Sequence, residues 1–322
     1  MTNNSFIEIS NELKKAKHVY IFPHISMDGD AVGSGVALAS ALRYLGISCN
    51  IVVEDNMPEN LKFMEGDFFI DYIFADKKEF TSVCVDCSDY GRFPLRGNLF
   101  DLGKTKICID HHMTADPKFD LNYIDQHAAA TAEIIYDLIN VMEVPITKDI
   151  ADAIFLGITT DSGNFQYSNT TKKTHLIAAD LADKGADFNK ISVAFYENET
   201  IEKVKLTGEI MSSILLFANN KAAFGIVTQN LLKKCNAKME YSEGTVANIR
   251  AIKDVEIAGL FKEVEPKKIK ISLRAKGDTD VAQIAEKHNG GGHKKAAGCT
   301  IFGTMDEAIE IIKKEVEESF AE

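Results

Sequence analysis

Apolar runs and helix-like segments alternate along the first half of the chain. Short runs rich in β-branched and aromatic residues predict buried strands at residues 18–22, 49–53, 81–85 and 106–109. Apolar residues at helical spacing predict helices at about residues 31–45, 131–143 and 148–159. Strands separated by helical segments predict a parallel sheet with helices on both faces, and hence an α/β fold.

The second half of the chain begins with a different pattern. Residues 189–217 show helical periodicity interrupted only by Gly208, which predicts a helical connector rather than a flexible linker. An α/β pattern follows from residue 218 to the end. Its predicted strands are 222–228, 255–263 and 268–275, and its predicted helices are 229–236, 280–288 and 304–319. We therefore expect two domains, residues 1–188 and a smaller one at 218–322.

Length and composition fit this division. A chain of 322 residues is long enough for two domains, each with its own hydrophobic core. Its 45% hydrophobic and 26% charged residues are ordinary for a soluble globular protein. The first residues lack the basic and apolar regions of a secretory signal, and no apolar stretch reaches the roughly 18 residues of a membrane span. We expect a cytoplasmic protein that does not contact a membrane.

The net charge of −12 narrows the class of substrate. Proteins that bind long nucleic acids usually carry a basic face, because neutralising the backbone phosphates supplies most of the affinity. In an acidic chain, phosphate binding must be confined to a local pocket. A nucleotide substrate is therefore expected to be short, and we expect no long nucleic acid as a partner.

Histidine and aspartate residues gather where the predicted strands end. The first, third and fourth strands are followed or ended by such residues: His24, Asp28 and Asp30, then Asp86, then Asp110, His111 and His112. Each aspartate alone could be a helix N-cap or a turn residue, and so could Asp161 in its Asp-Ser-Gly-Asn segment. The whole set favours a metal centre, because the carboxyl ends of parallel strands meet at one edge of a sheet.

The order of these residues resembles that of the DHH phosphoesterases, which are named for an Asp-His-His segment such as residues 110–112. The segment Gly290-Gly291-Gly292-His293, followed by Lys-Lys-Ala-Ala-Gly, resembles the glycine-rich motif of the DHH-associated domain. Together the motifs cover essentially the whole chain and are similar to those of the stand-alone nanoRNase and pAp-phosphatase group. The resemblance implies an N-terminal parallel-sheet DHH domain, a helical connector and a smaller C-terminal α/β DHH-associated domain.

The resemblance also assigns roles to the clustered residues. One metal ion would be held by His24, Asp28 and Asp86, and the second by Asp30, Asp86, His111 and Asp161, with Asp86 as the bridge. Asp110 would orient an imidazole, and His112 would either act beside the scissile phosphate or form a supporting hydrogen bond. Carboxylates and imidazoles without a required thiolate suit two Mn²⁺ ions, with Mg²⁺ or Co²⁺ as substitutes.

The second domain is expected to bind substrate. Backbone amides at Gly291 and Gly292, with His293, could form a phosphate-binding nest, and Arg274 offers a bidentate partner for a terminal phosphate. The implied reactions are hydrolysis of short oligoribonucleotides to mononucleotides and of pAp to AMP and phosphate. A cyclic di-AMP or pApA phosphodiesterase is the nearest alternative, and a non-catalytic nucleotide-binding sensor is another. The expected partners are short RNA or nucleotide substrates and, in a homodimer, a second copy of the chain.

Overall fold

The computed structural model describes residues 3–112, 119–277 and 279–320. The chain forms two compact units, Met1–Asn198 and Glu199–Glu322. In the described parts of both units, no helix is long and apolar enough to cross a membrane.

The first unit is built on a six-stranded sheet in which all the strands are parallel. In chain order the strands are β1 (His18–Phe22), β2 (Ser48–Val53), β3 (Phe69–Asp71), β4 (Thr81–Val85), β5 (Lys106–Asp110) and β6 (Leu121–Ile124). Their spatial order is β3-β2-β1-β4-β5-β6. The chain therefore changes direction across the sheet between β1 and β4, the place where open α/β sheets bind ligands at their carboxyl edge.

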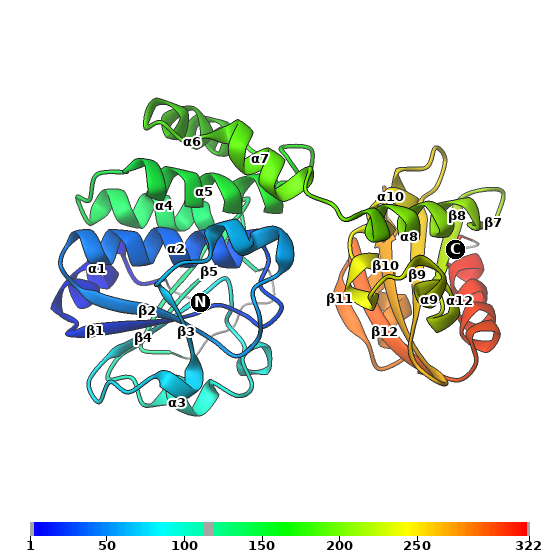
Figure 1. The fold of residues 1–322 in the computed structure, drawn as a ribbon, viewed down its shortest axis with the longest axis horizontal. Helices are drawn as coiled ribbons and strands as arrows, with labels where there is room; N and C mark the ends of the chain where they lie inside the picture. The colour runs from blue at the N-terminus through cyan, green and yellow to red at the C-terminus, as the bar shows by residue number, and fades with distance from the viewer. Residues whose placement is uncertain (1–2, 113–118, 278, 321–322) are drawn as a thin grey trace. The chain divides into compact units, whose positions relative to one another are not determined.

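Helices lie on both faces of this sheet, which confirms the predicted fold class (Figure 1). On one side are α1 (Phe6–Lys15), α2 (Gly29–Tyr44), α4 (Thr131–Val141) and α5 (Lys148–Asp161), and on the other is α3 (Gly97–Asp101). Alternate side chains of β1 point to opposite faces of the sheet. Val19 and Ile21 pack in the core with α2, whereas Tyr20 and Phe22 pack with Phe100 of α3. Two further helices, α6 (Lys172–Asp183) and α7 (Phe188–Tyr196), complete the unit.

Close packing of α2 against α5 brings the start of one helix to the end of the other. A Cβ atom at Gly33 of α2 would overlap the carbonyl oxygen of Ala153, and one at Gly157 of α5 would overlap Asp30. Only glycine allows the two backbones to approach this closely. This packing places Asp30, near the start of α2, beside the helix that ends in Asp161.

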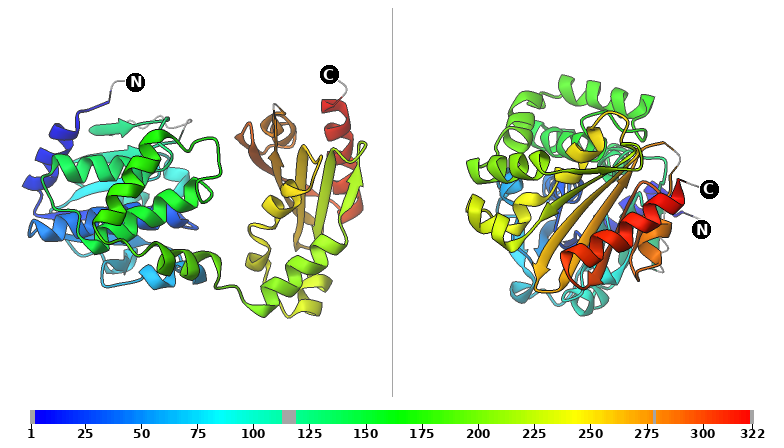
Figure 2. Two further views of the ribbon diagram at one scale, coloured as in Figure 1. Left: turned by 90° about the horizontal axis from the view of Figure 1, so that it is seen from above. Right: turned by 90° about the vertical axis from the view of Figure 1, so that its right-hand side faces the viewer.

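The second unit is a mixed six-stranded sheet in the order β11-β12-β10-β9-β8-β7. Its strands are β7 (Leu215–Phe217), β8 (Ala222–Val227), β9 (Ile257–Glu265), β10 (Lys268–Ala275), β11 (Gly291–His293) and β12 (Ala296–Phe302). One face packs against α8 (Ile201–Ser212), α9 (Gln229–Cys235) and α10 (Thr245–Ala251). The other packs against α11 (Val281–Glu286) and α12 (Met305–Ser319), the red helix in Figure 2.

The predicted connector, residues 189–217, is divided between the two units. Most of α7 falls within it and belongs to the first unit, whereas α8 contributes Leu206 and Ile210 to a core of the second. The two units meet in sequence at Asn198 and Glu199. The functional domain limits, 1–188 and 218–322, stay a prediction.

Candidate metal centre

The register of the three central strands aligns three of the candidate residues in one row across the sheet. Phe22 of β1 pairs with Cys84 of β4, and Cys84 pairs with Cys108 of β5. His24, Asp86 and Asp110 each follow two residues later, so they form the next row at the carboxyl edge of the sheet.

Asp86 turns the chain at the end of β4. Its φ of 55° lies in the left-handed region, which costs a residue other than glycine about 1 kcal/mol. Its amide donates to the carbonyl oxygen of Ile109 at 3.0 Å, which holds the turn against β5. Backbone strain that the surrounding structure maintains is typical of functional positions.

The first group of potential ligands contains His24, Asp28 and Asp86. His24 Nε2 lies 3.6 Å from Asp28 Oδ2 and 3.5 Å from Asp86 Oδ2. Ligands held about 2.0–2.2 Å from one ion stand roughly 3–3.6 Å apart, so these separations suit a shared cation.

The tautomer of His24 also fits a cation. Its Nδ1 lies 2.7 Å from the carbonyl oxygen of Ile25, which can only accept, so Nδ1 carries the proton. Nε2 is buried and has no hydrogen-bond partner among the described residues. A buried ring nitrogen that faces two carboxylates, in a ring held through its other nitrogen, is the arrangement expected of a metal-ligating imidazole.

The second group contains Asp30, His111 and Asp161. His111 Nε2 lies 3.2 Å from Asp161 Oδ2 and 3.9 Å from Asp30 Oδ2. The Nδ1 atom of His111 lies 3.2 Å from the carbonyl oxygen of Ala128, so this ring is held in the same tautomer as His24.

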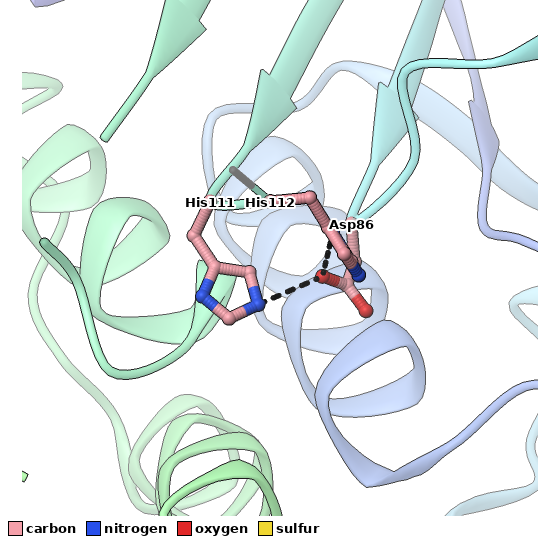
Figure 3. Close-up of side chains that lie close together, drawn as sticks. All are labelled: Asp86, His111 and His112. Carbon is pink, nitrogen blue, oxygen red and sulfur yellow. Dashed lines mark ion pairs between the residues drawn. The ribbon is translucent and has the colours of Figure 1, made fainter. Parts of the chain in front are cut away.

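Asp86 faces both groups with different oxygens. Its Oδ2 is the atom near His24, whereas Oδ1 lies 3.6 Å from His111 Nε2 and 3.6 Å from His112 Nδ1. In Figure 3 the dashed lines that mark the ion pairs of the two histidines meet at this one oxygen. The Thr131 hydroxyl donates to Oδ1 at 2.9 Å and fixes the carboxylate. A carboxylate with one oxygen in each group can bridge two cations.

Two of the aspartates also cap helices. Asp28 Oδ1 accepts the amides of Asp30 and Ala31 as the N-cap of α2, which leaves Oδ2 to face His24. Asp30 is fully buried and accepts the first amides of α4, from Thr131 at 2.6 Å and Ala132 at 2.9 Å. The N-cap interpretation is therefore correct for Asp28, but capping and ligation use different oxygens there.

The protonation of these groups reflects their excess of negative charge. Burial alone would lower the pKa of both imidazoles, but neighbouring carboxylates raise it to about 10 for His24 and to about 9 for His111. Burial, with some help from nearby carboxylates, raises the pKa of Asp161 to about 7 and that of Asp30 well above its usual range. Bound cations would compensate the charge that protons otherwise neutralise.

Asp110 orients the ring of His112 rather than that of His111. Its Oδ1 accepts the backbone amide of His111 at 2.8 Å and Nδ1–H of His112 at 2.7 Å. Burial would raise the pKa of Asp110, but the His112 donors lower it to about 2, so the carboxylate is an acceptor. His112 Nε2 points instead to Arg92, whose NH1 lies 3.3 Å away. Arg92 was not predicted as a site residue, because a single arginine in a loop carries no signal in the sequence.

The predicted substrate-binding residues lie together in the second unit. Cα pairing aligns Arg274 of β10 with Ala296 of β12, and Ala296 with His293 of β11, so Arg274 and His293 occupy one row about 10 Å apart. The side chain of His293 is not among those that the structure describes. Arg274 NH1 donates to the carbonyl oxygen of Leu273 at 3.0 Å.

Gly291 and Gly292 differ in whether the local backbone requires a glycine. Gly292 has a φ of 144°, and a Cβ atom there would overlap the backbone of Ala296. At Gly291 a Cβ atom would meet none of the described atoms within 4 Å. Hairpin packing therefore explains Gly292 but not Gly291.

Known protein families match both units. The DHH family, N-terminal domain, matches residues 18–158, and the DHHA1 domain matches residues 219–322. The chain is 31% identical to the bifunctional oligoribonuclease and PAP phosphatase NrnA of Thermus thermophilus, over 93% of this chain and 89% of that one. The chain belongs to the DHH family. The DHH match includes every candidate ligand except Asp161, which lies just beyond it.

Other DHH relatives agree over similar lengths. The protein of the same name from Bacillus subtilis is 29% identical over 91% of this chain and 92% of its own. A crystal structure of an exopolyphosphatase-related protein from Bacteroides fragilis is 26% identical, with a TM-score of 0.90 over 97% of this chain and 96% of that one. Exonuclease RecJ bound to manganese is 15% identical with a TM-score of 0.54, over 100% of this chain and 95% of that one, which shows a shared fold alone.

Proposed function

We propose that this DHH protein is a metal-dependent phosphoesterase that hydrolyses short oligoribonucleotides to mononucleotides and pAp to AMP and phosphate. The central observation is that Asp86 directs one carboxylate oxygen to His24 and the other to His111, each of which is a histidine held through Nδ1 within a group of potential ligands. The names of the Thermus and Bacillus relatives supply the substrate class.

We further propose two Mn²⁺ ions, with Mg²⁺ or Co²⁺ as substitutes. One would be held by His24, Asp28 and Asp86, and the other by Asp30, Asp86, His111 and Asp161. Neither group contains a thiolate, and hard oxygen ligands with imidazoles suit Mn²⁺. Bound together, such ions would supply an activated water and stabilise the charge of an in-line phosphoryl displacement. Four carboxylates balance two dications, so a phosphate meets a centre that is close to neutral.

The residues beside the metal groups would position the reacting phosphate. Asp110 holds the Nδ1–H of His112, which directs Nε2 away from the Asp86 carboxylate. Burial opposes protonation of His112, but Asp110 and Asp86 raise its pKa. We propose that His112 hydrogen-bonds the phosphate through Nε2 and protonates the leaving oxygen.

The second unit would bind the terminal phosphate of the substrate. Gly291 supports this role, because an exposed glycine that hairpin packing does not require leaves room for close approach of a ligand to its amide. Arg274 and His293 would add charged donors from the same row of the sheet. We expect Arg274→Ala to lower kcat/KM on pAp about 10- to 100-fold without changing the metal content, since a charge-assisted hydrogen bond contributes about 1.5–3 kcal/mol.

Product analysis tests the proposed function directly. The Mn²⁺-loaded protein would be incubated in parallel with pAp, pApA, cyclic di-AMP and a short RNA of a few residues. We expect AMP and phosphate from pAp, mononucleotides from the RNA, and no reaction after chelation. Absence of hydrolysis of both pAp and the RNA by folded, metal-loaded protein would contradict the proposal. Exclusive cleavage of cyclic di-AMP or pApA would assign the chain to nucleotide signalling, and binding without turnover would make it a sensor.

A further inference from the structure

Arg92 places a positive charge at the edge of the metal groups. It ends the 3₁₀ turn Tyr90–Arg92, in the loop that follows Asp86, and it is half-buried. Its NH1 lies 3.3 Å from His112 Nε2. Within the described part of the chain, no carboxylate forms an ion pair with it. Its guanidinium is therefore directed at the atom that would meet the phosphate.

Backbone contacts fasten Arg92 to the neighbouring strand end. The amide of Ile25, next to His24, donates to the carbonyl oxygen of Arg92 at 2.7 Å. The Arg92 amide donates to the carbonyl oxygen of Asp89 at 3.0 Å and closes the turn. The position of the guanidinium is thus tied to the loop that carries the first metal group.

A buried ion pair between Arg96 and Glu54 also holds the loop that carries Arg92. Arg96 is fully buried, and its Nε donates to Glu54 Oε2 at 2.8 Å while NH1 donates to the carbonyl oxygen of Val52 at 2.5 Å. Glu54 also accepts the backbone amides of Leu95 and Arg96. Glu54 follows β2, and Ile25 follows β1, so the loop that carries Arg92 is held at the ends of two strands. Substrate binding therefore has to pay little entropy to order this loop.

The charge balance leaves Arg92 available to an anion. Two dications would offset the four carboxylates of the metal groups, and Asp110 is occupied by His112. A guanidinium and an imidazole Nε2 only 3.3 Å apart present two nitrogen atoms to one point. In the direct contact the guanidinium donates to Nε2. A phosphate oxygen would accept from the guanidinium in place of this contact, and Nε2 would donate to the same phosphate when the ring is protonated.

We propose that Arg92 binds a non-bridging oxygen of the substrate phosphate at the metal groups, where His112 contacts the same phosphate. The assignment rests on the proposed phosphoesterase function and adds to it a residue that binds substrate. Arginine suits the task because its planar fork matches the geometry of two phosphate oxygens, whereas lysine offers only a point charge.

Arg92 could instead serve only as a counter-charge to the carboxylates, and the two roles predict different results. A counter-charge repels incoming cations, so its removal would tighten Mn²⁺ binding and leave phosphate binding unchanged. A phosphate ligand, when removed, weakens binding of inorganic phosphate and AMP to the Mn²⁺-loaded protein while the metal content stays the same.

The test uses Arg92→Ala and Arg92→Lys, with Arg43→Lys as the matched control. Arg43 lies in the last turn of α2, at the opposite end of the helix from Asp28 and Asp30, and pairs with Asp67. Thermal midpoint, Mn²⁺ content, phosphate affinity by calorimetry and kcat/KM on pAp would be measured for each. We expect Arg92→Ala to keep its metal and to lose about 10- to 100-fold in both phosphate affinity and kcat/KM. Arg92→Lys should be intermediate, and Arg43→Lys should match the wild type.

Unchanged phosphate affinity in a folded, metal-loaded Arg92→Ala protein would overturn the assignment. If the wild type hydrolysed none of the phosphate esters, the proposed function would fail. The calorimetric comparison with inorganic phosphate would still decide the role of Arg92, because it does not depend on turnover.

Discussion

Metal binding should release protons from the two ligand imidazoles at neutral pH. The pKa values of about 10 for His24 and about 9 for His111 mean that both rings are protonated at pH 7 in the metal-free protein. Asp161, with a pKa of about 7, is then half protonated. Ligation requires the unprotonated forms, so binding of Mn²⁺ should displace at least about two protons at pH 7, one from each imidazole. The apparent affinity should therefore rise with pH, about tenfold per pH unit for each proton released, up to the range of these pKa values.

Calorimetric titration of metal-free protein with Mn²⁺, in buffers of different ionisation enthalpy, measures the released protons directly. His24→Gln should lower the count by about one, because it removes one of the two protonated rings. His127→Gln, at an exposed position, should leave the count unchanged. A release near zero at pH 7, or an affinity that does not vary between about pH 6 and 8, would refute the proposed ligand set.

Three further predictions concern single positions. Asp86→Ala should abolish turnover and lower the Mn²⁺ content, and normal activity in this variant would rule out a shared bridge. Asp110→Asn should keep its metal but lower kcat by about 10²- to 10⁴-fold, because His112 loses the acceptor that orients it; a change in KM alone would contradict this role. Gly33→Ala should lower the free energy of unfolding by about 1–3 kcal/mol through overlap with α5, whereas Gly208→Ala, in open space on α8, should raise it by about 0.5–1 kcal/mol. Equal thermal denaturation of the two glycine variants would show that the overlap at Gly33 is relieved elsewhere.

The strands of the first unit could be predicted because burial on both sides leaves continuous apolar runs. Thr81–Val85 is buried at all five positions, and the run in the sequence matches the strand. The two edge strands, Phe69–Asp71 and Leu121–Ile124, were not predicted, since short and partly exposed edge strands leave no such run. The helix Phe6–Lys15 was also missed, although the capping box formed by Ser5 and Glu8 was a readable signal.

The aspartates and histidines at the strand ends could be identified because they directly follow the predicted strands. Their contacts with distant parts of the chain could not be predicted. Asp30 caps α4, whose first residue lies 101 positions further along the chain. No local pattern encodes a contact at that separation. The left-handed backbone at Asp86 and the approach of Arg92 to His112 likewise depend on how separate loops meet. Sequence patterns thus indicate which residues could act, and tertiary packing decides their partners.

The register between neighbouring strands links the sequence pattern to the packing of the site. A shift of one residue between β4 and β5 would move Asp110 to the opposite face from Asp86, because successive side chains alternate across a sheet. The observed pairing of Cys84 with Cys108, and of Val85 with Ile109, prevents this. These side chains are fully buried, so a shifted register would expose apolar surface or bury polar groups on both faces. The buried core beneath the site therefore fixes the alignment on which a shared metal centre depends.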